Sequence, residues 1–155
     1  MSLQDYATRK YDYLGLRNVK QFKETQLGLE LFNAADNGQI CAGTQKLSQR
    51  WLLEFMTARG SMSGLPDRGC DFMTYVMQGR LRTLFELQAL FSASELDIRK
   101  NLQQEEYSGM PDDERLNYAE LLDASVFPGY LTISVKINSV AGDSRKIIVP
   151  VATLP

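Results

Sequence analysis

Carboxylates are the side chains from which this sequence would have to build acid–base catalysis. The 155 residues include no histidine, so Ser-His-Asp and Cys-His catalysis and ordinary histidine-bearing zinc sites are excluded within this chain. A catalytic carboxylic acid needs an apolar or cleft environment that raises its pKa, and no sequence pattern marks one. We therefore expect no enzyme, and we expect solvated helix surface at the four candidates: Glu54, Glu86, Glu95 and Asp71.

Other functional classes lose support in the same way. Neither GxxxxGK[ST] nor GxGxxG occurs, so nucleotide binding has no motif behind it and no cofactor is expected. Cys41 and Cys70 do not form a zinc motif, and we expect free thiols in a reducing cytoplasm. The net charge of −2 gives no overall attraction to nucleic acid. No apolar run approaches the roughly 18 residues of a membrane span, and the N-terminus lacks a signal-peptide core.

A loop rich in glycine and charge, TARGSMSGLPDRGCDF (Thr57 to Phe72), separates two helix-like segments. Glycines permit tight or left-handed backbone, and a carboxylate at the start of the next helix satisfies its free N–H groups. We interpret this loop as scaffold rather than as an anion site; its structural residues are Gly60, Pro66, Asp67, Gly69 and Asp71. Arg59 and Arg68 have no local role, so we expect each to pair with acids of this chain or of a partner.

Three helices are predicted between about residues 44 and 107. The first begins at a Thr44 cap and fades near Gly60, with an apolar stripe at Leu47, Trp51, Leu52 and Phe55. The second is a short helix, Asp71–Gly79, with Phe72, Tyr75, Val76 and Met73 inward. The third is the longest, with Leu84, Leu87, Phe91, Ile98 and Leu102 repeating at helical spacing, and Ser94 is expected to divide it.

The last forty residues change to β-forming composition. LTISVKINS alternates apolar and polar residues and predicts a half-buried strand. KIIVPV predicts a second strand, which Pro150 confines to a sheet edge or to its own end. RLNYAELLDAS is open between helix and strand. Helices followed by a small antiparallel sheet, at about residues 115 to 151, predict an α+β fold.

The first forty residues are expected to form an N-terminal arm. The segment from Thr25 to Phe32 alternates leucines and predicts a short strand. Aromatic residues are unusual in a disordered tail, so an arm that docks on a neighbour is an alternative to a floppy terminus. Its expected contact residues are Tyr6, Tyr11 and Tyr13.

The order of these segments resembles the lysozyme-like baseplate wedge family of contractile-tailed phages, which also supplies a subunit of the type VI secretion baseplate. The resemblance covers about residues 40 to 150: a helix ending in MTARGS, then LPDRGCDF, further helices, DERL and a β-hairpin. Members typically show a Thr and a Gly at the end of the helix and a Pro–Gly turn after it, here Thr57, Gly60, Pro66 and Gly69. Where members carry Glu-Pro-Arg, this chain has Asp113-Glu114-Arg115, without the proline.

The resemblance implies a structural subunit of the virion that is assembled in the host cytoplasm in several symmetric copies. Its implied partners are other wedge proteins and the tail sheath, with no small-molecule substrate, no membrane and no nucleic acid. The implied contacts with the wedge core are Glu114 and Arg115, to which we add Arg68. The resemblance implies that the sheet contacts the sheath by strand exchange. We expect the Leu131–Ser139 and Lys146–Val151 strands to take part, with edge residues Ile147, Ile148, Val149 and Val151.

Two other classes stay open. A lysozyme-like fold invites a glycosidase, which would need one carboxylic acid and a second carboxylate about 5–9.5 Å away. The basic segments QGRLRT and IRK invite a head–tail connector or a nucleic-acid-binding protein, although acidic residues interrupt both. Phosphate contacts would give DNA binding a steep salt dependence.

Overall fold

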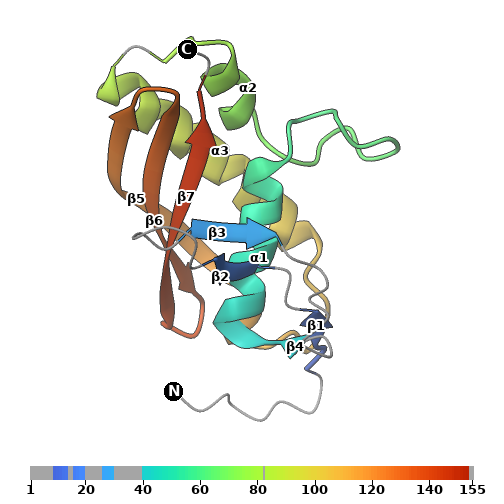
Figure 1. Cartoon of the computed structure of the whole chain (residues 1–155). Coiled ribbons are helices and arrows are strands. Elements are labelled where there is room, and N and C mark those ends of the chain that lie inside the picture. The colour runs from blue at the N-terminus through green and yellow to red at the C-terminus, as the bar shows by residue number, and fades with distance from the viewer. Residues whose placement is uncertain (1–8, 14–15, 20–25, 30–39, 82, 154–155) are drawn as a thin grey trace.

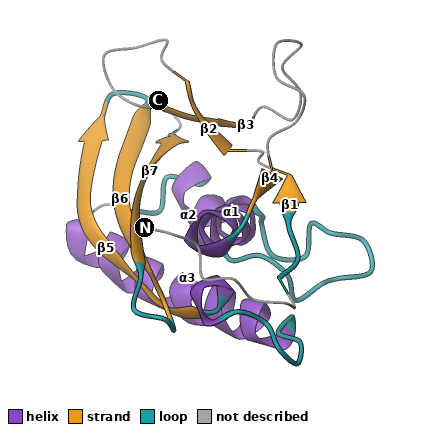
Figure 2. Cartoon of the chain, turned by 90° about the horizontal axis from the view of Figure 1, so that it is seen from below, coloured by secondary structure: helices purple, strands orange, loops and turns teal. Residues whose placement is uncertain are grey.

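The protein has an α+β fold, as the sequence predicts (Figure 1). The computed structural model describes residues 9–13, 16–19, 26–29, 40–81 and 83–153, with side chains at 9–12 and from residue 40 onward. Three helices come first in the main body and a three-stranded antiparallel sheet comes last. The sheet curves around one side of the helices, so that α1 and α3 line its inner face (Figure 2).

Helix α1 (Gly43–Met56) carries the predicted apolar stripe into the core. Leu47, Trp51, Leu52 and Phe55 are all buried. The predicted Thr44 cap is wrong, because the N-cap position lies two residues earlier, at Ala42, and has no side-chain cap. The N-terminus of α1 is satisfied instead by a carboxylate from a distant segment, described below.

Helix α2 (Phe72–Met77) is short, and helix α3 (Leu84–Gln104) is long and continuous. Phe72 and Val76 are buried as predicted, whereas Tyr75 is exposed beneath the guanidinium of Arg80. The predicted break at Ser94 is wrong: Ser94 is buried within α3.

Helix α3 has its capping signal at Thr83, not inside the helix. The Thr83 side chain accepts from the Glu86 backbone N–H, and the Glu86 side chain accepts from the Thr83 N–H, which is a capping box. Leu84, predicted inward, lies in the first turn and is 56% exposed.

The C-terminal sheet has the strand order β5-β6-β7 and is antiparallel throughout. Its strands are β5 (Leu116–Phe127), β6 (Tyr130–Ser139) and β7 (Ser144–Ala152). The ambiguous RLNYAELLDAS segment is therefore strand, because it pairs with β6 along nearly its whole length. β6 buries Leu131, Ile133, Val135 and Ile137, so the alternation read from the sequence is confirmed.

An aromatic cluster joins the helices at the centre of the core. Trp51 stacks on Phe55 with ring centroids 4.9 Å apart, and Phe55 lies 4.7 Å from Phe72. Phe91 of α3 packs against all three of these rings. Burial of a large apolar side chain contributes about 1.5–3 kcal/mol, so this cluster is a major source of stability and fixes α1 against α3.

The described parts of the N-terminal segment form two small antiparallel ladders. β1 (Asp12–Tyr13) pairs with β4 (Ile40–Cys41), next to the start of α1. β2 (Leu16–Val19) pairs with β3 (Gln26–Leu29), which confirms a strand inside the predicted Thr25–Phe32 segment. β3 lies against β7 without joining its hydrogen-bonded ladder (Figure 1).

Candidate partner-binding site

The acidic turn at the start of the sheet points its successive side chains in opposite directions. It is a short 3-10 helix, η1 (Asp112–Glu114), which packs against α1. Glu114 is 0% exposed, and the next residue, Arg115, has a side chain that is 37% exposed. The two residues that the family resemblance marks as one contact site therefore have different roles in this chain.

Glu114 closes the N-terminus of α1. Its Oε1 accepts from the backbone N–H of Gly43 at 3.2 Å, and its Oε2 accepts from Lys46 Nζ at 2.8 Å. A carboxylate at a helix N-terminus satisfies a free N–H group and is favoured by the helix dipole. Glu114 thus supplies, from a distant part of the chain, the cap that Thr44 was predicted to give. In this conformation its side chain presents no surface to a partner.

The N-terminal arm covers the same acidic turn. Arg9 donates to Glu114 Oε1 and to Asp113 Oδ2, each at 2.8 Å, and its side chain is only 3% exposed. Burial alone would lower the pKa of the Arg9 guanidinium, but hydrogen bonds and charge from Asp113 and Glu114 outweigh it and the pKa is raised. Lys46 adds a second contact by donating to the backbone carbonyl of Lys10. Arg9 and Lys46 were not identified from the sequence.

Arg115 lies on the surface and pairs with acids of its own neighbourhood. Its Nε lies 2.9 Å from Glu106 Oε2, and its Nη1 lies 3.1 Å from Asp112 Oδ1. These hydrogen bonds, first that of Glu106, raise the pKa of Arg115. The backbone carbonyl of Arg115 accepts from Val140, which fixes the residue at the edge of the sheet. The guanidinium is therefore oriented, and still accessible.

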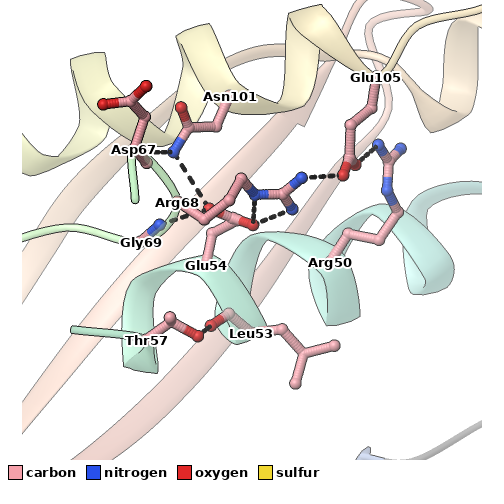
Figure 3. Close-up of polar contacts among 9 residues, drawn as sticks. All are labelled: Arg50, Leu53, Glu54, Thr57, Asp67, Arg68, Gly69, Asn101 and Glu105. Atoms are coloured by element: carbon pink, nitrogen blue, oxygen red, sulfur yellow. Dashed lines mark hydrogen bonds and ion pairs between the residues drawn. The ribbon is translucent and has the colours of Figure 1, made fainter. Parts of the chain in front are cut away.

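Arg68 reaches the same end of α3 from the glycine-rich loop. Its guanidinium pairs with Glu105, the C-cap residue of α3, and with Glu54 of α1 (Figure 3). Arg50 completes the group, with Nη2 2.7 Å from Glu105 Oε2. Because Glu105 holds Arg68 and the adjacent Glu106 holds Arg115, the structure brings these two predicted partner-binding arginines to one end of one helix.

Glu54 anchors the glycine-rich loop from inside. It is 4% exposed, and its Oε2 accepts from the Gly69 N–H at 2.9 Å and from Asn101 Nδ2 at 3.2 Å (Figure 3). Asn101 also donates to the carbonyl of Asp67. The interpretation of the loop as scaffold agrees with these contacts. No sequence pattern connected Glu54 to the loop.

Gly69 is the position in this loop that only glycine fits. Its φ is +83°, and an added Cβ would lie 2.3 Å from the carbonyl oxygen of Thr57. That close approach lets Cys70 donate to the Thr57 carbonyl at 3.0 Å, and Arg59 donate to the Cys70 carbonyl. Asp71 occupies the N-cap position of α2 as predicted, but it makes no cap hydrogen bond and pairs with Arg59 at 3.4 Å instead.

The predicted sheath-binding strand is an edge of the three-stranded sheet. Ile147, Val149 and Val151 are buried in the core, whereas Ile148 is 37% exposed on the other face. The Thr153 N–H donates to the Gly129 carbonyl. Because antiparallel pairs alternate, the Ile148 N–H and the nitrogen of Pro150 face away from β6. Pro150 thus stands where its missing donor interrupts no bond within the sheet.

The predicted arm contacts are only partly described. Tyr11 is 60% exposed. Tyr13 pairs through its backbone with Ile40, while its side chain and the whole of Tyr6 lie outside the described residues. The partner role of these tyrosines stays a prediction.

An open cavity of about 530 Å³ lies between α3 and β5 and holds one of the candidate acids. Glu95 is 7% exposed there, and burial raises its pKa although the Ala119 N–H and Arg99 act in the opposite direction. Glu120 lines the same cavity and pairs with Lys136 at 3.2 Å. The expectation that all four candidate acids are solvated is therefore wrong for Glu95 and Glu54.

The two cysteines are free, as expected, and both are buried. Among the described residues no group of histidine, cysteine or carboxylate side chains is arranged to hold a metal ion. In that same part of the chain, no helix combines the length and the apolar character that crossing a membrane requires. No protein-family model matches this sequence, and no curated protein matches it significantly.

Proposed function

We propose that this protein is a non-catalytic structural subunit of a contractile tail baseplate, present in several copies in the virion. The observation that carries the proposal is the different surroundings of two adjacent residues, Glu114 and Arg115, at the acidic turn. Glu114 caps α1, whereas the partly exposed Arg115 pairs with Glu106 at the end of α3 where Arg68 pairs with Glu105. A guanidinium held in a fixed orientation at a surface suits recognition of carboxylates or backbone carbonyls in a neighbouring protein.

The test is copurification with the other baseplate wedge proteins. Arg115→Ala is expected to leave the melting temperature within a few degrees, because exposed ion pairs contribute about 0–1 kcal/mol, and to reduce wedge copurification. Arg59→Ala is the matched control: Arg59 has a side chain that is 39% exposed and also pairs with two carboxylates, Asp71 and Asp97. Equal copurification of the two variants would contradict the proposal.

The second contact of the proposed subunit is with the tail sheath at β7. A strand added to this edge would hydrogen-bond to the outward N–H and C=O groups of β7, including those of Ile148. Since β3 lies against β7, such a strand has to displace β3 or enter beside it. Ile148→Pro removes one outward donor without removing a bond to β6. We expect it to fold and to bind its wedge, and no sheath to polymerise above the baseplate.

The control for this variant is Ile148→Ala, which shortens the side chain and keeps the N–H. Sheath of normal length on Ile148→Pro baseplates would show that β7 is only a protected edge. Sheath lost equally in both variants would assign the effect to the side chain and not to backbone pairing.

A glycosidase is the second candidate function, because Glu95 and Glu120 line one cavity and the pKa of Glu95 is raised. In that reading Glu95 would be the acid and Glu120 the second carboxylate. We propose the structural role over this one, since Glu95 already accepts from Ala119 and pairs with Arg99, and Glu120 pairs with Lys136. Peptidoglycan clearing above a heat-killed control that is abolished by Glu95→Gln would favour the glycosidase over the structural role.

A further inference from the structure

Two adjacent carboxylates of η1 share one guanidinium in this structure. Arg9 sends Nη1 to Glu114 and Nη2 to Asp113, each over 2.8 Å. Both carboxylates are nearly inaccessible, with side chains 0% and 8% exposed. The planar fork of a guanidinium presents two N–H groups side by side to two acceptors, a geometry that the rotatable donors of an ammonium do not fix. The turn is thus shaped for an arginine.

Arg9 leaves one carboxylate oxygen of this turn without a hydrogen-bond donor among the described residues. Asp113 receives Arg9 on Oδ2, and its Oδ1 is buried without a hydrogen-bond partner among the described residues. A buried acceptor without a donor is unfavourable. An arginine that approached Asp113 through both of its oxygens would remove that cost.

Residues 10 to 13 follow Arg9 along this side of the molecule. Lys10 places its ammonium 4.2 Å from the Tyr107 ring centroid, and its carbonyl accepts from Lys46. β1 contributes a two-residue ladder to β4. Lys10 and Tyr11 themselves are exposed. The two residues that follow Arg9 therefore bury little surface of their own.

We propose that Asp113 and Glu114 form an arginine-binding site that the arm's Arg9 occupies in the free chain and vacates for an arginine of another protein chain. The arm is then an internal competitor that withholds the site until a partner with a better-fitting arginine arrives. Displacement opens the β1–β4 ladder and releases the arm together with Tyr11. This proposal relies on the proposed function only for the identity of the partner, as a baseplate protein.

The site also explains why the competing side chain is an arginine and not a lysine. Glu114 Oε2 is already occupied by the Lys46 ammonium at 2.8 Å. A second ammonium would lie near the first positive charge and has no fixed planar pair of donors for the remaining oxygens. A guanidinium spreads its charge and bridges both residues.

The experiment uses the full chain and the short peptides Gly-Arg-Gly amide and Gly-Lys-Gly amide as probes. The backbone amide of Gly43 is the NMR reporter, because its N–H donates to Glu114 Oε1. In Arg9→Ala, the arginine peptide is expected to shift the Gly43 signal and to bind at least about tenfold more tightly than the lysine peptide. Wild-type protein is expected to bind the arginine peptide at least about tenfold more weakly than the variant.

Alkylation of cysteines provides a second readout of the arm. Cys41 belongs to β4 and pairs with Asp12 of the arm, whereas Cys70 lies in the core away from this ladder. Arg9→Ala is expected to raise the alkylation rate of Cys41 several-fold and to leave that of Cys70 unchanged, since only Cys41 depends on the arm. If Arg9→Ala does not fold, peptide binding and cysteine alkylation are both measured on Arg9→Lys, which keeps the charge.

Several outcomes would overturn the proposal. A Gly43 signal unmoved by the arginine peptide would remove the binding site, and equal affinity for both peptides would remove its arginine selectivity. Equal affinity of wild type and variant would remove the competition by Arg9. None of these results depends on Arg115 or on copurification with baseplate proteins, so this proposal and the proposed function can fail separately.

Discussion

Glu54 of α1 and Arg68 of the following loop form a direct ion pair in which Arg68 Nε lies 2.6 Å from Glu54 Oε1. The pair is partly shielded, with side chains 6% and 24% exposed. It ties the end of the first helix to the loop that leads to the second, so the loop has a fixed shape despite its glycines.

Glu54→Gln is expected to destabilise the protein by about 2–4 kcal/mol. Removing one charge of a buried pair costs about 3–5 kcal/mol when the other charge is fully buried and left uncompensated. The cost is smaller here because Arg68 is partly solvated and keeps its pair with Glu105. Urea denaturation measures the loss. The control is Glu120→Gln, because Glu120 pairs with Lys136 at the surface, where a pair contributes about 0–1 kcal/mol. A loss no larger than that of the control would show that Glu54 does not anchor the loop.

Gly69→Ala is expected to destabilise the protein by more than the ~1–2 kcal/mol that a left-handed conformation costs by itself. The additional loss arises because the new Cβ would meet the Thr57 carbonyl oxygen at 2.3 Å, and backbone cannot move aside cheaply. Gly64→Ala is the matched control, with φ +81° and no atom within 4 Å of the added Cβ. Equal melting temperatures of the two variants would mean that the close approach at Gly69 is not needed for folding.

The sequence predicted the fold where side-chain periodicity decides it. The apolar stripe of α1 and the alternation of β6 follow from burial of one face, which is a local property. Ser94 was misread because a serine inside a long helix satisfies the same pattern as a serine that starts one. In the structure Ser94 is buried within α3, which runs unbroken from Leu84 to Gln104.

The candidate site was harder to predict, because its contacts join residues far apart in the chain. Glu114 caps a helix 71 positions away and meets Arg9 across 105 positions. The sequence does contain one local signal of these distant contacts. Lys46, Arg50 and Glu54 recur every four residues along α1, beside the apolar stripe, and each pairs with a different distant segment. A row of charges at helical spacing next to a buried face therefore indicates contacts with the rest of the chain as well as with solvent.

Glu105 is expected to stabilise the folded protein above its ordinary pKa of 4.5 and to lose that contribution in acid. Burial alone would raise the pKa of Glu105, but Arg50 and Arg68 outweigh it and the pKa is lowered. The unfolded chain then binds the proton first, so the stabilisation is complete above the unfolded pKa and disappears as pH falls through the folded pKa.

Glu105→Gln measures this contribution. At neutral pH the variant should be less stable than wild type by up to about 1 kcal/mol, a value kept small because the Glu105 side chain is 36% exposed and screened. The difference should shrink as urea denaturation is repeated at lower pH. A difference that stays constant or grows in acid would contradict the role of the two arginines.

Glu95 is expected to show the opposite pH dependence. Burial is the main cause of its raised pKa, although the Ala119 N–H and Arg99 favour the charged form. Between the unfolded pKa, ordinarily 4.5, and the raised folded pKa, the folded state binds more protons than the unfolded state. The contribution of Glu95 to stability is therefore complete below the unfolded pKa and is lost as pH rises through the folded pKa.

Glu95→Gln keeps an acceptor for Ala119 and removes the titration. Urea denaturation from about pH 4 to about pH 7 should show wild type losing stability relative to this variant as pH rises, while it gains stability relative to Glu105→Gln over the same range. If both differences change in the same direction, the carboxyl group in the α3–β5 cavity is hydrated in the folded protein and its burial does not control its ionisation.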